Sequence, residues 1–140
     1  VVSDTVNTAA RMEGLTKHFK SGIILSDSTI RGIRTPQDFP VRPLGLVQVK
    51  GREEVLMIYE SFAGDSPIQK RLKTQTLADF KAGLNAYFEQ EFFQSTQAFG
   101  RVLKTNPIDP TARRYQALAS RYLREGIPVD WDGIERLEQK

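Results

Sequence analysis

The sequence of 140 residues contains no cysteine and a single histidine. It also has no apolar run near the roughly 20 residues needed to span a bilayer. The absence of cysteine excludes disulfides, thiolate zinc sites and cysteine nucleophiles. The first residues, VVSDTVNTAAR, have neither the basic nor the apolar region of a secretory signal. These absences predict a cytoplasmic protein, and an anchor further upstream in a longer parent protein would be compatible with them.

A strong charge of one sign is also lacking. The net charge is +3, and the basic residues are scattered along the chain, which argues against a nucleic-acid-binding stripe. The hydrophobic share of 39% and the charged share of 26% are typical of a soluble globular protein. The length suits one ordinary domain or two small units.

The residues from 1 to 63 alternate between helix and strand signals. A helix is expected from Ser3 or Asp4, which suit its N-terminal end, to about Phe19. The elements expected after it are a strand at 22–26, a short helix ending near residue 33, and a hairpin of residues 44–50 and 55–62. This pattern predicts an α+β fold. Because so few elements cannot cover both faces of a sheet, we expect further elements upstream.

The second half of the chain has a different pattern. Residues 64–75 are predicted to be a linker, and residues 76–140 an all-α tail that ends in a short helix containing Trp131, Ile134 and Leu137. The residues that resemble one tetratricopeptide (TPR) repeat of about 34 residues are Gly83, Tyr87, Phe92, Phe99 and Pro107. Two residues depart from that repeat. Asp79 stands where the repeat usually has an aromatic residue, and Ser95 stands where it usually has alanine. We therefore describe the tail as TPR-like.

The most informative motif is the stretch Asp4-Thr5-Val6-Asn7-Thr8-Ala9-Ala10-Arg11. On a helix, Asn7, Arg11 and Gly14 fall on one stripe, separate from the apolar stripe. A guanidinium offers donors that suit phosphate oxygens, and an amide can hold a hydroxyl group. An Asn and an Arg four residues apart are also common on a solvated helix face. The surrounding sequence has to decide between these interpretations.

That surrounding sequence carries a resemblance. The motif, the strand at Ile24–Ser26, the turn Val49-Lys50-Gly51 and the final strand at Val55–Glu60 occur in the order found in class III nucleotidyl cyclases. Together they resemble the C-terminal part of the catalytic domain of that family. The resemblance implies that residues 1–63 form part of a ferredoxin-like cyclase domain.

The resemblance also implies roles for particular residues. The family converts ATP to cyclic AMP and pyrophosphate by attack of the ribose 3′-hydroxyl on the α-phosphate. By this resemblance Arg11 would stabilise the α-phosphoryl group and Asn7 would orient the ribose. Lys50 would bind the terminal phosphates, and Arg52 would add positive charge beside it. Lys50 could otherwise be an ordinary hairpin lysine.

Other parts of a cyclase site have no counterpart in this sequence. The two carboxylates that hold Mg²⁺ or Mn²⁺ in the family would lie upstream, so we assign no metal ligand in this chain. The residue that selects adenine or guanine would precede Val1, which leaves ATP and GTP open as substrates. We therefore expect this fragment alone to be inactive. Family domains work as head-to-tail dimers, so Asn7 and Arg11 are expected to act on the site of the partner subunit.

Two alternatives from other classes remain open. In one, a degenerate cyclase-like scaffold carries a helical interaction module, whose TPR-like tail binds a protein partner. In the other, the chain is only a dimerisation unit, with homodimers or self-association through exposed sheet edges. The presence of Asn7, Arg11 and Lys50 together favours the cyclase interpretation.

Overall fold

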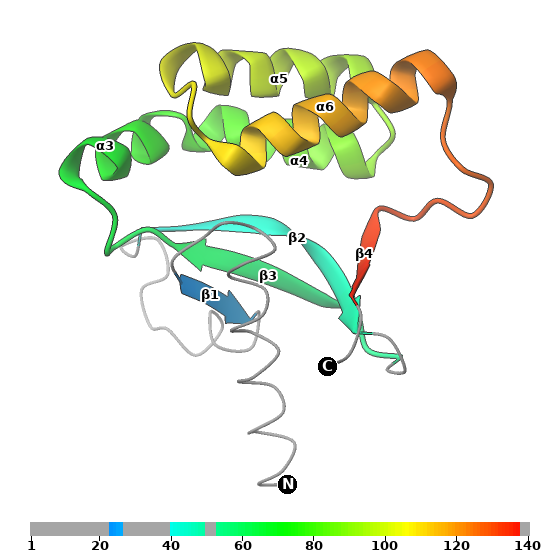
Figure 1. The fold of residues 1–140 in the computed structure, drawn as a ribbon, viewed down its shortest axis with the longest axis horizontal. Helices are drawn as coiled ribbons and strands as arrows, with labels where there is room; N and C mark the ends of the chain where they lie inside the picture. Colours follow the sequence, from blue (N-terminus) through cyan, green and yellow to red (C-terminus); the bar gives the residue numbers. More distant parts are fainter. Residues whose placement is uncertain (1–22, 27–39, 50–52, 138–140) are drawn as a thin grey trace, which may run out of the picture. The chain divides into compact units, whose positions relative to one another are not determined.

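A computed structural model describes residues 23–26, 40–49 and 53–137 of the chain, which divides into two compact units (Figure 1). The sheet unit consists of Val1–Asp65 together with Ile134–Lys140. The helical unit consists of Ser66–Gly133 and therefore lies, in sequence, between two parts of the sheet unit. No helix in the described ranges is long and apolar enough to cross a membrane.

Among the described residues, four strands form the sheet, in the order β1-β3-β2-β4. They are β1 (Ile23–Ser26), β2 (Val41–Val49), β3 (Leu56–Ser61) and β4 (Ile134–Leu137). β2 and β3 pair antiparallel, and β1 pairs antiparallel with the other edge of β3. The strand predicted at 22–26 and the predicted hairpin are thereby confirmed. The helices predicted at 4–19 and near residue 33 lie outside the described residues.

A β-bulge in β2 sets which side chains are buried in the sheet unit. The pairing register shifts between Pro43 and Gly45, and Gly45 has a φ of 149°, a conformation that favours glycine. Strict alternation would place Leu44 and Val47 on opposite faces of the strand. With the extra residue, both are buried, at 0% and 1% exposure.

The strand β4 corrects the prediction of a closing helix around Trp131, Ile134 and Leu137. Residues 134–137 form a strand that pairs parallel with the last four residues of β2, and Trp131 lies in the loop before it. The spacing of three between the two aliphatic residues suits a helix, but the pairing partner is far away in sequence. Gly133, with a φ of 77°, also interrupts any helix at this point.

The helical unit contains four helices. They are α3 (Pro67–Gln75), α4 (Leu77–Phe88), α5 (Phe92–Thr105) and α6 (Pro110–Glu125). The last three occur where the sequence pattern predicts helices, whereas their assignment as a TPR stays a prediction. The range predicted as a linker, 64–75, contains α3, and the predicted domain boundaries stay predictions.

Local and long-range contacts explain α3. The Ser66 hydroxyl accepts a hydrogen bond from the Gln69 N–H at 3.2 Å, and Pro67 follows in the first turn, where its missing N–H costs nothing. The side-chain amides of Gln69 and Asn106 then exchange two hydrogen bonds, of 3.2 and 3.0 Å. This pair attaches α3 to the end of α5.

Aromatic rings form most of the core of the helical unit. Tyr87 on α4 contacts five other rings, with centroid distances between 4.9 and 6.3 Å: Phe88, Phe92, Tyr115, Tyr122 and Trp131. Phe99 on α5 adds a stacked contact with Tyr115 and an edge contact with Phe80. Such pairs add about 0.5–1.5 kcal/mol each to the burial of the rings. The sequence predicts this aromatic stripe as core, and the packing confirms it.

The crossing of α4 and α5 accounts for one departure from the repeat pattern. Gly83 faces the ring of Phe99 so closely that a Cβ there would lie 2.8 Å from two ring carbons. The Ser95 hydroxyl donates a hydrogen bond of 2.9 Å to the Gly83 carbonyl, and Ser95 is fully buried. A serine therefore replaces alanine where it binds the backbone of the facing helix.

We expect Gly83→Ala to lower the free energy of unfolding of the helical unit by about 1–3 kcal/mol, because the new methyl group overlaps the Phe99 ring. Urea unfolding followed by the fluorescence of Trp131, the single tryptophan, measures this effect. Gly100→Ala is the matched control, since its Cβ meets only the end of the Gln116 side chain, at 3.3 Å. A cost for Gly83→Ala no larger than for Gly100→Ala would contradict the close crossing.

The stability of the helical unit is expected to fall above pH 10. Burial raises the pKa of Tyr115 to about 12, against the opposing charge of Arg114. The folded state therefore keeps its proton where the unfolded chain, with the ordinary value of 10.0, has lost it. The contribution of Tyr115 to the free energy of unfolding is fully present below pH 10. It is lost as the pH rises toward 12, by at most about 1.4 kcal/mol per pH unit for this group. Burial also raises the pKa of Tyr87, with the same sign.

Urea unfolding by circular dichroism at pH 8, 10 and 11 measures this loss. Tyr115→Phe keeps the ring and removes the titrating hydroxyl, so we expect a smaller decrease in the unfolding free energy between pH 10 and pH 11. The same decrease in both proteins would show that Tyr115 does not carry the effect.

Candidate functional site

The residues predicted to act on substrate, Asn7, Arg11, Lys50 and Arg52, all lie outside the described residues. Their roles therefore stay predictions. Lys50 and Arg52 belong, in sequence, to the connection between β2 and β3, whose two ends are described. The described part of the candidate site is therefore the β2–β3 hairpin on either side of this connection.

The described ends of the connection are held together. The ladder between β2 and β3 runs as far as the pair Val47 and Leu56. Beyond it, the Gln48 side-chain amide donates a hydrogen bond of 3.0 Å to the Glu53 backbone carbonyl. The strand β4 pairs with the same end of β2 from the opposite side. The chain therefore leaves β2 and returns to β3 at fixed points on either side of residues 50–52.

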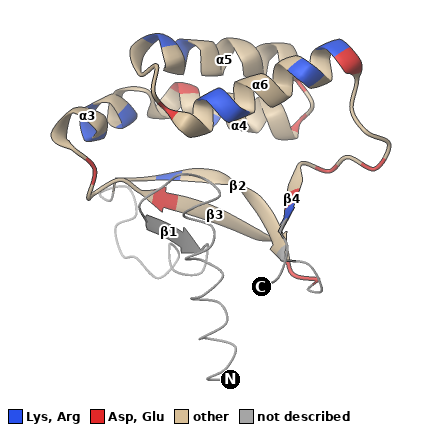
Figure 2. Cartoon of the chain, viewed as in Figure 1, with Lys and Arg blue, Asp and Glu red and all other residues tan. Residues whose placement is uncertain are grey.

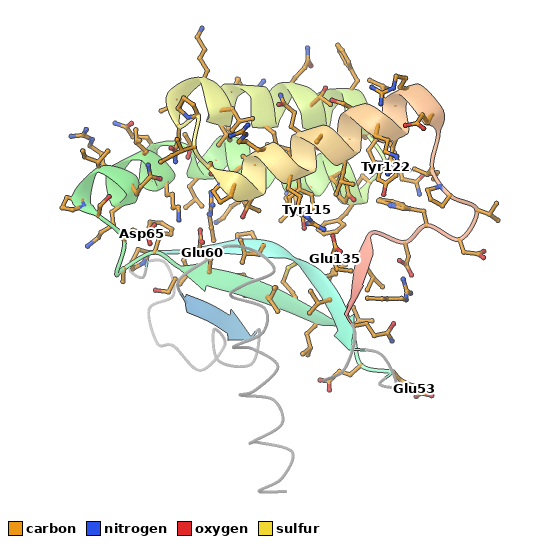
Figure 3. The ribbon with its side chains drawn as sticks, in the orientation of Figure 1. Glu53, Glu60, Asp65, Tyr115, Tyr122 and Glu135 are labelled. Atoms are coloured by element: carbon orange, nitrogen blue, oxygen red, sulfur yellow. The ribbon has the colours of Figure 1, made fainter. Side chains whose placement is uncertain are left out.

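The charges along this connection balance in sequence. Lys50 and Arg52 are followed directly by Glu53 and Glu54, which are both exposed. Figure 3 labels Glu53 at the described end of the connection. Two cations beside two carboxylates give no net charge. Binding of an anion there would depend on the orientation of the cations rather than on a general excess of positive charge.

A buried ion pair joins the two strands at the other end of the hairpin. Arg42 on β2 and Glu60 on β3 are direct partners in the ladder, and the Arg42 Nε lies 2.6 Å from the Glu60 Oε1. Their side chains are 1% and 4% exposed. These two buried charges stabilise the sheet and are not accessible to substrate, and removing one partner of a buried ion pair typically costs about 3–5 kcal/mol. Sequence reasoning missed this pair, because Arg42 and Glu60 face each other only in the register that the bulge in β2 creates.

In the helical unit, the positions of Lys and Arg residues are distributed over α3, α5 and α6 (Figure 2). One of them explains a second departure from the repeat pattern. Asp79 on α4 forms an ion pair of 2.9 Å with Arg101 on α5, and both side chains are substantially exposed. An exposed pair of this kind contributes about 0–1 kcal/mol, so it aligns two helices without forming a site.

The described residues offer no ready site for a metal ion. In the parts of the chain that the structure describes, no three histidine, cysteine, aspartate or glutamate residues come together as ligands. The prediction that metal ligands lie upstream is not tested by this and stays a prediction.

Comparison with known proteins gives a specific similarity. The chain is 41% identical over 61 residues to an adenylate cyclase of Anabaena cylindrica and 37% identical over 59 residues to adenylate cyclase 1 of Rhizobium meliloti. These stretches cover 43% and 42% of the chain but only 12% and 9% of those relatives. No protein-family profile matches the chain. No solved structure matches it either.

A third relative matches a longer stretch. The terminal-differentiation-specific adenylate cyclase of Dictyostelium discoideum is 30% identical over 109 residues, which is 77% of this chain and 5% of that protein. In a chain of 140 residues, a stretch of that length includes β2, β3 and the helices α3 to α5 wherever it begins. The similarity therefore extends into both units. Over these partial stretches, the chain is a homologue of adenylate cyclases.

Proposed function

We propose that this chain is part of a class III adenylate cyclase, which converts ATP to cyclic AMP and pyrophosphate in the cytoplasm. The observation that carries the proposal is the similarity to several adenylate cyclases at 30–41% identity. Because the matched stretches span only 5–17% of those proteins, the catalytic activity is assigned to a longer parent. Within that parent, this chain would supply groups that position the substrate.

Arg11 and Asn7 have the main roles in this proposal. Attack of the ribose 3′-hydroxyl on the α-phosphate increases negative charge on the α-phosphoryl oxygens in the transition state. A fixed guanidinium at that place lowers the barrier, since it interacts more strongly with the transition state than with bound ATP. Asn7 would hold the ribose in the orientation for attack. Both residues are expected to reach the active site of the partner subunit in a homodimer.

Lys50 and Arg52 would bind the terminal phosphates of ATP. The frame of the β2–β3 hairpin supports this assignment, because it fixes both ends of the short connection that carries them. The neighbouring Glu53 and Glu54 would repel phosphate, and the positive charges of Lys50 and Arg52 would offset this repulsion. Catalysis by the parent would also use Mg²⁺ or Mn²⁺, held by carboxylates outside this chain, to neutralise phosphate charge.

One observation favours a second function for part of the chain. The helical unit has its own aromatic core and contains nearly half of the residues, yet none of the proposed substrate contacts lies in it. It could bind a protein partner, either as part of an active cyclase or on a degenerate scaffold. Two acidic metal ligands in the upstream sequence of the parent would favour the active enzyme.

The proposal is tested by measuring cyclic AMP formation from ATP with magnesium or manganese. We expect turnover by the full-length parent and none by the 140-residue chain, because the proposed ligands of the metal ions belong to the parent and none is assigned in this chain. Absence of activity in the full-length parent under these conditions would count against the cyclase assignment. Robust turnover by the 140-residue chain would show that the metal site has been placed wrongly.

A further inference from the structure

The helical unit has two distinct ends, because its long helices run antiparallel. Asp79 near the start of α4 pairs with Arg101 near the end of α5, and Tyr87 near the end of α4 contacts Phe92 at the start of α5. The contact of Phe92 with Tyr122 places the start of α5 beside the end of α6. One end of the unit is therefore formed by α3 and the α5–α6 connection, and the other by the α4–α5 turn and the residues after α6.

These two ends carry opposite charge (Figure 2). The half of the unit with α3, residues 66–82 and 99–117, contains eight Lys or Arg residues and two Asp residues, a net charge of +6. The other half, residues 83–98 and 118–133, contains two Arg residues and five Asp or Glu residues, a net charge of −3. Those two arginines, Arg121 and Arg124, both contact Glu125. We call the two halves the basic end and the acidic end.

Both ends also expose large apolar side chains. At the basic end, Ile68 and Ile108 are 60% and 67% exposed, and they belong to the two segments that the hydrogen bonds between Gln69 and Asn106 join. At the acidic end, four such residues are between 36% and 98% exposed: Phe93, Leu123, Ile127 and Val129. Among the described residues of the helical unit, large exposed apolar side chains thus occur at the two ends and not between them.

Opposite charge and shared apolar character make the two ends complementary to each other. Apolar side chains at both ends would leave water on contact, and the surrounding charges would attract. Two basic ends, or two acidic ends, would instead repel. Short helical arrays commonly bury their outer faces by stacking on a neighbouring array. A second copy of this chain therefore offers each end the partner that its chemistry suits.

We propose that the basic end of one copy binds the acidic end of another, so that the helical units of this chain associate head to tail. Such a contact joins two different surfaces and can link more than two copies, whereas a two-fold dimer joins a surface to itself. The inference rests on the helical unit alone and does not depend on the proposed cyclase function.

Sedimentation of the 140-residue chain over a range of concentrations tests the proposal with one double variant for each end. Ile68→Ser with Ile108→Ser alters the basic end, and Leu123→Ser with Val129→Ser alters the acidic end. Because these side chains are exposed, both proteins are expected to keep the wild-type circular dichroism. We expect each change to raise the dissociation constant roughly tenfold or more. Lys81→Ser, at an exposed position in the middle of α4, is the control and should leave it unchanged.

An equimolar mixture of the two double variants gives the decisive result. Each protein keeps the end that the other has lost, so the mixture is expected to form a one-to-one complex with nearly the wild-type dissociation constant. Raising NaCl from about 0.05 to about 0.5 M should weaken that complex, because salt screens the charges. No recovery of association in the mixture would overturn the proposal.

Crosslinking identifies the surfaces that meet. The chain has no cysteine, so Ile108→Cys and Val129→Cys each introduce a single thiol. With a flexible crosslinker that reacts at both of its ends with thiols, a mixture of the two proteins, one of them isotopically labelled, should give mixed dimers above their statistical share. Statistical yields would contradict the head-to-tail direction. A chain that stays monomeric up to about 1 mM, whether or not its basic end binds phosphatidylserine vesicles, would rule out a second copy as the partner.

Discussion

Replacing Arg11 by alanine in the full-length parent is expected to lower kcat for cyclic AMP formation by about 100- to 1,000-fold. The guanidinium is proposed to contact oxygens that gain charge only as the reaction proceeds. Its loss should therefore reduce kcat much more than it raises KM. Initial rates over a range of ATP concentrations separate the two parameters.

Two further substitutions serve as controls for Arg11. Arg11→Lys keeps the charge but loses the planar fork of donors, so an intermediate rate is expected. Lys17→Ala removes a cation from the same predicted helix, away from the stripe of Asn7 and Arg11, and should leave kcat unchanged. Equal losses for Lys17→Ala and Arg11→Ala would show that general charge, not a specific contact, matters.

The proposed dimer arrangement predicts a further result for Arg11→Ala. If Arg11 completes the site of the partner subunit, then Arg11→Ala mixed with a variant lacking a metal carboxylate should regain part of the activity. The reason is that one of the two sites in a heterodimer receives both intact halves. No recovery in mixtures that form heterodimers would exclude action across the interface.

Phe99→Ala is expected to have the largest effect on stability, a loss of about 3–5 kcal/mol from the unfolding free energy of the helical unit. Phe99 is fully buried, stacks on Tyr115 with ring planes 12° apart, and meets the edge of Phe80. Removing the ring leaves a cavity between α4, α5 and α6 that rigid neighbours cannot fill. Urea unfolding followed by Trp131 fluorescence measures the loss.

The same helix provides the control for Phe99→Ala. Phe93 is 54% exposed, so Phe93→Ala should change stability by only about 0.5 kcal/mol. A second check uses Gly83: on a Phe99→Leu background its replacement by alanine should cost less, because the ring that it would meet is gone. An unchanged cost for Gly83→Ala would show that Phe99 does not occupy the space beside it.

Much of the fold could be predicted because its signals are local. Alternation along β2 and β3, and the helical spacing of residues such as Phe80, Leu84 and Tyr87, give each segment one favourable periodicity. The helix α3 was missed despite a Ser-Pro start at Ser66, since its polar composition resembles that of a linker. Its contact with Asn106 lies far along the sequence and could not be inferred.

The candidate site was predicted from a motif rather than from geometry. Asn7, Arg11 and Lys50 were identified by their order and resemblance, and the similarity to adenylate cyclases supports that interpretation at the level of the family. No comparable sequence motif indicates the function of the helical unit. The pairing of β4 with β2 is likewise visible only in the structure.

The sequence by itself determined the family to which the chain is similar, the β2–β3 hairpin and the helices α4 to α6, because short-range periodicity and motif order suffice for each. Only the tertiary structure decided the pairing of β4 with β2, the buried pair of Arg42 and Glu60, and the hydrogen bond from Ser95 to Gly83. Each of these joins segments that are distant in sequence. Such contacts depend on which surfaces meet after the elements have formed, and no local pattern specifies that.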